Sequence, residues 1–223
     1  MTASTELIIL NTTKFRENQL VLHTLSREHG RRSFLVRVGK GAGMALYLPL
    51  NILEGDVTEN PKSSLWTVRN LSSVHPLNGL RSNPYKNTMT LFMSEVLFRA
   101  LKEGAVEAGL FDWCRRTVLT LDALEANYSN FPIRFLLELA GALGFSTTFE
   151  GIAPFAGTVQ GGAFNHLQTL QAFLGASFPE SMLIPLSGPD RNAIAEELIR
   201  YLEFHTETPL NIRSLKVLRE LYA

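Results

Sequence analysis

Cysteine, net charge and long apolar runs are scarce in this chain, and each scarcity excludes a class of protein. The 223 residues include one cysteine, Cys114, so neither an intrachain disulfide nor a cysteine-rich zinc site can form. The longest apolar stretches, such as residues 33–38 and 44–50, are far shorter than the roughly 20 residues that a membrane-spanning helix needs. Residues 1–6 lack the pattern of a secretory signal. We therefore expect a soluble cytoplasmic protein with no membrane partner.

Positive charge is concentrated at the N-terminal end of the chain. The whole sequence is neutral, with 21 basic and 21 acidic residues, and so lacks the overall positive charge of many nucleic-acid-binding proteins. Residues 1–40 nevertheless carry an excess of four positive charges. The basic residues of this segment are Lys14, Arg16, Arg27, Arg31, Arg32, Arg37 and Lys40. Such a local excess favours nucleic-acid binding, and the alternative is a solvated sheet face with no partner.

The first 75 residues have the periodicity of β-strands. Short segments that are rich in β-branched residues and bounded by turn-forming residues predict strands over residues 6–10, 19–25, 32–38, 47–57 and 65–74. Gly30 lies in a tight reversal between the second and third segments, where a positive φ is accessible to it. Five short strands favour a closed barrel, because closure removes the exposed edges of a small sheet.

From residue 84 onward the apolar residues recur at helical spacing. This spacing predicts a helix that begins at Pro84 and ends near Gly104, and a glycine-rich loop over residues 151–162. Further helices are predicted over residues 110–126, 132–143, 165–174, 190–205 and 213–222. Prolines, a glycine and an asparagine interrupt the periodicity over residues 75–84, which marks the boundary between the two halves.

Four segments carry a family resemblance. They are residues 8–31, with a glycine at the strand reversal, and residues 48–54, 131–145 and 198–218. In their order and spacing these segments resemble the bacterial RecO recombination-repair family. The resemblance implies an α+β protein, with a five-stranded barrel of the oligonucleotide-binding (OB) type over residues 1–78 and an all-α domain over residues 79–223.

The resemblance also implies a function without catalysis or cofactor. Members of the family bind single- and double-stranded DNA, anneal complementary strands and help to load recombinase. The implied protein partners are RecR, in some species RecF, and the acidic C-terminal tail of single-strand-binding protein, and the implied location is the nucleoid. Two departures matter: many relatives carry a four-cysteine zinc site and several cations after the third strand, whereas this chain has Cys114 and Lys40 alone. We therefore expect no metal and weaker DNA binding.

Four cations are the predicted DNA contacts: Arg16, Arg27, Arg37 and Lys40. Arg31 and Arg32 are neighbours on a strand, so their side chains point to opposite faces and cannot both join one row. DNA-binding barrels also use exposed aromatic rings that stack on bases. The aromatic residues of this half are Phe15, Phe34, Tyr47 and Trp66, and each is more typical of a core position.

In the helical half, Arg115, Arg116 and Arg134 are the predicted partner-binding residues. An acidic peptide that ends in an apolar residue and a free carboxylate needs a cation beside a hydrophobic groove. These arginines lie among Phe-rich helical segments that can supply one. The alternative is that each forms a surface salt bridge with Asp or Glu.

Enzyme motifs are not found. The segment from Gly39 to Gly43 resembles a phosphate-binding loop, but no helix is predicted after it, so we interpret it as a flexible hairpin loop. The five histidines show no metal-ligand spacing, and Cys114 has no evident base beside it. Two alternatives to a DNA-binding protein remain. One is an interaction scaffold with the same fold and little DNA affinity, and the other is a hydrolase or transferase, which requires a pocket of perturbed titratable groups.

Overall fold

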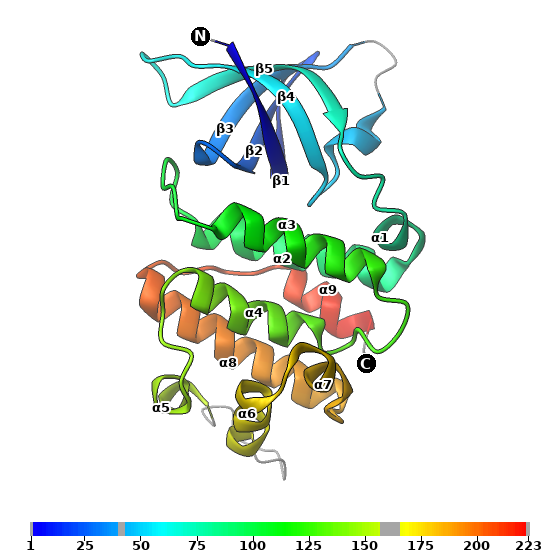
Figure 1. Cartoon of the computed structure of the whole chain (residues 1–223), viewed down its shortest axis with the longest axis vertical. Coiled ribbons are helices and arrows are strands. Elements are labelled where there is room, and N and C mark those ends of the chain that lie inside the picture. The colour runs from blue at the N-terminus through cyan, green and yellow to red at the C-terminus, as the bar shows by residue number, and fades with distance from the viewer. Residues whose placement is uncertain (1, 40–42, 157–165, 222–223) are drawn as a thin grey trace.

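Five strands close into a barrel at the N-terminal end of the protein (Figure 1). The structure, a computed structural model, describes residues 2–39, 43–156 and 166–221. The strands are β1 (Thr2–Arg16), β2 (Gln19–Ser26), β3 (Gly30–Arg37), β4 (Ile52–Thr58) and β5 (Leu65–Ser73), hydrogen-bonded in the order β1-β2-β3-β5-β4. All neighbours in this order are antiparallel except β3 and β5. The predicted five-stranded barrel is confirmed.

Strand β1 is much longer than the predicted segment 6–10 because it serves two neighbours. Its first part, from Thr2 to Ile8, pairs with β4, and the part from Leu7 to Arg16 pairs with β2. Within the second part, residues 11–16 include Asn11, two threonines, Lys14 and Arg16 and are mostly exposed. It therefore lacks the apolar alternation from which a strand is predicted.

The fourth strand begins later than predicted. The expected strand over residues 47–57 is wrong at its start, where η1 (Met44–Tyr47) is a turn of 3-10 helix, and β4 begins at Ile52. The Asn51 side chain stabilises this turn, because its amide donates to the carbonyl oxygens of Ala45 and Leu46 at 2.8 and 2.9 Å. Tyr47 packs into the barrel core from the turn.

Helices make up the rest of the described chain, which confirms the predicted α+β class. In Figure 1, α2 and α3 lie directly beneath the barrel, while α5, α6 and α7 lie farthest from it. The helices are α1 (Asn78–Ser82), α2 (Pro84–Ala100), α3 (Leu110–Ala123), α4 (Phe131–Ala142), α5 (Phe149–Ile152), η2 (Ala153–Phe155), α6 (His166–Gly175), α7 (Phe178–Leu183), α8 (Gly188–Thr206) and α9 (Ser214–Leu221). The predicted loop over residues 151–162 is wrong where α5 and η2 occupy its start. None of these helices is both long and apolar enough to cross a membrane.

The barrel and the helices share a hydrophobic core. Leu7 and Ile9 of β1 point into the barrel, whereas Ile8 and Leu10 on the opposite face belong to the core that the helices form. Outward-facing Leu25, Leu50 and Ile52 join the same core. Burial of β1 on both faces therefore attaches the barrel to the helices. The domain boundary between residues 78 and 79 stays a prediction.

The hairpin between β2 and β3 docks by its backbone onto the loop between α2 and α3. The Arg31 N–H donates to the Ala105 carbonyl at 3.1 Å, and the Gly104 N–H donates to the Arg31 carbonyl at 2.7 Å. Gly30 turns the chain with a φ of +60°, and a Cβ atom there would lie 2.0 Å from the Ala105 oxygen. Only glycine satisfies both the backbone conformation and this approach.

We predict that Gly30→Ala destabilises the protein. The left-handed backbone alone costs an L-residue about 1–2 kcal/mol, and the hairpin must also move away from Ala105. Urea unfolding measures the loss. Gly43→Ala is the matched control, because no atom lies within 4 Å of its added Cβ. Equal stability of the two variants would contradict the tight docking.

Candidate nucleic-acid interface

The ends of three neighbouring strands bring two of the predicted DNA contacts together. Arg16 on β1 is opposite Gln19 on β2, and Gln19 is opposite Arg37 on β3. Residues paired directly across antiparallel strands point to the same face. Arg16 and Arg37 therefore share one face, two strand spacings or about 10 Å apart. The loop between the first two strands and the face of the second and third are where OB barrels bind oligonucleotides.

The cations of this row are exposed and carry unmatched charge. Arg16, Arg37 and the nearby Lys14 are all exposed, and no acid in the described part of the chain lies within ion-pair distance of them. Glu17 in the β1–β2 turn is the adjacent acid in sequence and pairs with none of them. We define Arg16, Gln19 and Arg37 as the cationic row; Lys14 flanks it at the end of β1, where it is opposite Leu20 and not Gln19. Lys14 and Gln19 were not predicted, although the two-residue turn sets the pairing of Arg16 with Gln19.

Arg27 lies elsewhere, at the seam between the barrel and the helices. Its guanidinium donates to Glu6 at 2.6 Å and to Asp112 at 2.7 Å. It also lies 4.6 Å from the ring centroid of Phe111. The hydrogen bond that Arg27 donates to Glu6, followed by its interactions with Asp112, raises the pKa of Arg27. A phosphate would have to compete with two carboxylates for this side chain.

Arg31 and Arg32 point to opposite faces of β3, as predicted. Arg31 is buried, ion-paired with Glu103, and 4.8 Å from the ring centroid of Phe98 on the helical side. Burial lowers the pKa of this guanidinium, although Glu103 opposes the shift. Arg32 lies instead over the Trp66 ring, 4.4 Å from its centroid. Lys40, the fourth predicted DNA contact, lies outside the described residues.

Exposure separates the four aromatic residues of the barrel. Phe34, Tyr47 and Trp66 are buried in the barrel core. The prediction of a core position is wrong for Phe15, which is 49% exposed. Its ring centroid is 5.3 Å from the Arg16 guanidinium carbon, at the edge of the cationic row.

The three predicted partner-binding arginines do not lie together. Arg115 faces the barrel seam, with Nε 3.5 Å from Glu6 and a hydrogen bond of 2.8 Å to Nε2 of His75. Arg116 and Arg134 line a hollow of about 310 Å³ between α3, α4 and α7. The residues that line this aromatic hollow are Trp113, Arg116, Thr117, Thr120, Phe131, Arg134, Phe135, Glu138 and Phe178.

The two arginines of the aromatic hollow differ in how their charge is matched. Arg134 donates to Glu138 at 2.7 Å and to the backbone carbonyls of Phe173 and Ala176 at the C-terminal end of α6, so its position is fixed. Arg116 is exposed and makes no ion pair with any described residue. The hollow therefore offers one unmatched cation beside four aromatic rings.

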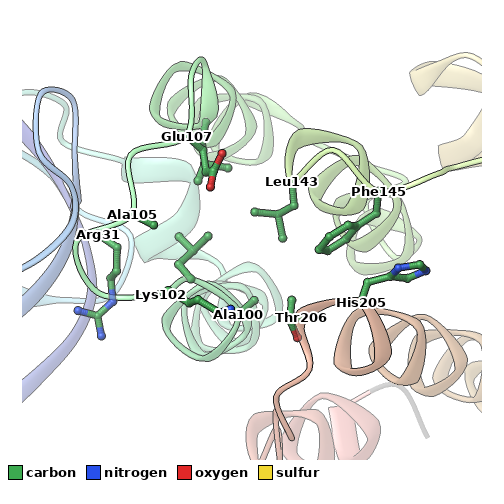
Figure 2. A pocket seen from close by; sticks show the side chains of 11 residues that line it. Arg31, Ala100, Lys102, Ala105, Glu107, Leu143, Phe145, His205 and Thr206 are labelled. Carbon is green, nitrogen blue, oxygen red and sulfur yellow. The ribbon is translucent and has the colours of Figure 1, made fainter.

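A second hollow, of about 220 Å³, lies where the β2–β3 hairpin meets the helices (Figure 2). Leu143 and Phe145 face its interior, whereas the guanidinium of Arg31 points away from it. His205 stacks on Phe145 with ring centroids 5.0 Å apart. No described hydrogen bond joins Arg31, Glu107 and His205 to one another. This hollow thus assembles no nucleophile with a base.

Cys114 and the acidic residues form no reactive or metal site in the described regions. Cys114 is 1% exposed, and burial raises the pKa of its thiol to about 12. No three His, Cys, Asp or Glu side chains among residues 2–39, 43–156 and 166–221 gather as metal ligands. The single cysteine does not fit the four-cysteine zinc site that the resemblance implies for other members of the family.

We predict that Cys114 resists thiol reagents in the folded protein. The thiolate is the reactive form, and burial both suppresses it and blocks access. Labelling with an aromatic disulfide at pH 8 should proceed no faster than unfolding, and should be complete within minutes in denaturant. Rapid labelling of the folded protein would show that α3 packs less tightly than described.

The fold and the cationic row define a class: a barrel of the OB type with an exposed basic face, joined to a helical unit. Two family profiles match the chain, "Recombination protein O N terminal" over residues 1–77 and "Recombination protein O C terminal" over residues 81–151. The protein belongs to the RecO family, whose role lies in DNA repair and recombination.

Individual relatives agree with the family profiles. A DNA repair protein RecO of Phocaeicola vulgatus is 26% identical over 239 residues, which cover 97% of both chains. That of Azobacteroides pseudotrichonymphae is 24% identical over 242 residues and the whole of both chains. That of Bacteroides fragilis is 29% identical over 141 residues, or 61% of this chain and 58% of the relative.

Proposed function

We propose that this protein is a non-enzymatic recombination mediator that binds DNA through the cationic row of its barrel. The observation that carries the proposal is the alignment of Arg16 and Arg37 across Gln19, with Lys14 nearby and no ion-paired acid among the described residues. Lys40, which follows the end of β3 by three residues, is a further proposed contact. Arg27 contributes less, because Glu6 and Asp112 already match its charge.

Binding of this kind uses contacts to phosphates and not to base edges. Cations that contact phosphates release counterions, which makes the affinity dependent on salt and tolerant of sequence. A mediator that holds two strands electrostatically lets complementary bases pair and anneal without covalent chemistry. Few cations imply weak binding, which suits a protein that must release the annealed product.

We predict that Arg16→Ala and Arg37→Ala weaken binding of labelled oligo-dT in fluorescence anisotropy. Each lost phosphate contact should reduce the slope of log K against log salt by about 0.7 on single strands. The wild-type slope should be about −2 for the three described cations, and steeper if Lys40 contributes.

Arg27→Ala is the matched control for these variants, since it removes an arginine from the same barrel. Its salt slope should stay within error of wild type. A slope that falls with Arg27→Ala and not with Arg16→Ala would place the DNA path at the seam instead. Binding that ignores salt would overturn the proposal altogether.

We propose further that the aromatic hollow binds the acidic C-terminal tail of single-strand-binding protein. A free carboxylate beside an apolar side chain suits one unmatched cation, Arg116, next to Trp113 and Phe135. Arg134 shapes the wall, and Arg115 supports the barrel seam. RecR, and RecF where it is used, are the other proposed partners, bound at surfaces that this hollow does not include.

We predict that Arg116→Glu weakens binding of an acidic peptide with an apolar last residue by about tenfold or more. A hydrogen bond to a charged group contributes about 1.5–3 kcal/mol, and the new carboxylate also repels the peptide. Isothermal titration calorimetry measures the loss. Arg213→Glu, an exposed arginine outside the hollow, is the control, and a C-terminally amidated peptide should bind weakly to wild type. Unchanged affinity in Arg116→Glu would place the peptide elsewhere.

One observation favours a second function, an interaction scaffold with little DNA affinity. Two of the six described cations in the basic segment, Arg27 and Arg31, are consumed by ion pairs within the molecule. Retention of RecR or of the acidic peptide, with no oligonucleotide binding at low salt, would select the scaffold over the mediator.

A further inference from the structure

Phe15 is placed in a way that packing of the barrel does not explain. Among the Phe, Tyr and Trp residues described between positions 2 and 73, it alone is exposed. Phe34, Tyr47 and Trp66 bury their rings in the barrel core at 0%, 6% and 8% exposure, against 49% for Phe15. Exposing a phenylalanine to this extent forgoes about half of the free energy that its full burial would contribute.

A β-bulge directs this side chain outward. Lys14 is opposite Leu20 and Arg16 is opposite Gln19, so β1 has one residue more than β2 at this point, and that residue is Phe15. Leu20 belongs to the barrel core. Bulges at sheet ends re-aim a side chain, and this one frees Phe15 from the strand's alternation.

The ring also stands among groups that bind phosphate. Lys14 and Arg16 flank it in sequence, and Arg37 lies in the same row as Arg16. The Arg16 guanidinium carbon is 5.3 Å from the ring centroid. His23, farther along β2, adds no charge near neutral pH, because burial and then Arg31 lower the pKa of its imidazole.

We propose that Phe15 is a base-stacking residue that makes the cationic row prefer unpaired strands. The proposal rests on the DNA binding proposed above and names the form of DNA that this site selects. A ring next to phosphate-binding cations accepts the π-face of any base, so the preference is for strandedness and not for sequence. Bases in a duplex are stacked on each other and have no free face for Phe15 to contact.

Phe15→Ala separates stacking from charge. We expect it to weaken binding of oligo-dT by about 5- to 150-fold, the range for loss of one base–aromatic stack. Binding of a duplex, and of an abasic deoxyribose-phosphate strand, should change less than twofold. Phe15→Leu keeps apolar bulk and should lose most of the oligo-dT affinity, whereas Phe15→Trp should retain it and show tryptophan quenching on binding.

Phe204→Ala is the matched control, because Phe204 is a 67% exposed phenylalanine on α8, outside the barrel. Circular dichroism confirms that each variant is folded. Normal oligo-dT binding by Phe15→Ala, with loss of binding in Arg37→Ala, would overturn the stacking role and leave DNA binding intact. Equal losses on oligo-dT and the abasic strand would also overturn it. No binding of any DNA by wild type would defeat both proposals.

Discussion

The docking of the β2–β3 hairpin onto the α2–α3 loop constrains the rest of the molecule. It uses two backbone hydrogen bonds, the glycine at position 30 and the charges of Arg27 and Arg31. Arg31 and Arg37 lie six residues apart on one strand, or about 20 Å. The end of the barrel near the helices therefore consumes its cations in ion pairs, while the opposite end keeps Arg16 and Arg37 available. Attachment to the helices and the proposed DNA binding therefore use different cations of one basic segment.

Much of the fold follows from the sequence, because two-residue and helical periodicities occupy separate halves of the chain. The periodicity fails to predict an element where strand pairing or a side-chain hydrogen bond, and not burial, determines the backbone conformation. The polar half of β1 gives no alternation, yet it pairs with β2 along its whole length. The turn before β4 depends on the Asn51 amide, and Arg81 of α1 in turn donates to the Asn51 side-chain oxygen, a long-range contact that no local pattern encodes. The short helices α1 and α7 carry too few residues for a detectable period.

The site was harder to predict than the fold, because charge counting cannot distinguish a free cation from a paired one. Arg27 and Arg16 look alike in sequence, but Glu6 and Asp112 reach Arg27 from strands and helices that are distant along the chain. The two-residue turn between β1 and β2 does indicate the pairing of Arg16 with Gln19, and Gln19 is in turn opposite Arg37. Only the bulge distinguishes Phe15 from a core residue, since a single aromatic residue at the end of a strand is typical of a core.

The division of the basic segment is tested most directly by nuclear magnetic resonance of the arginine Nε–Hε groups during titration with a short oligo-dT. The signals of Arg16 and Arg37 should shift with added strand and return with added salt. Those of Arg27 and Arg31, held by carboxylates at the helical seam, should stay in place. Shifts confined to the seam arginines, with Arg16 and Arg37 unmoved, would contradict the account.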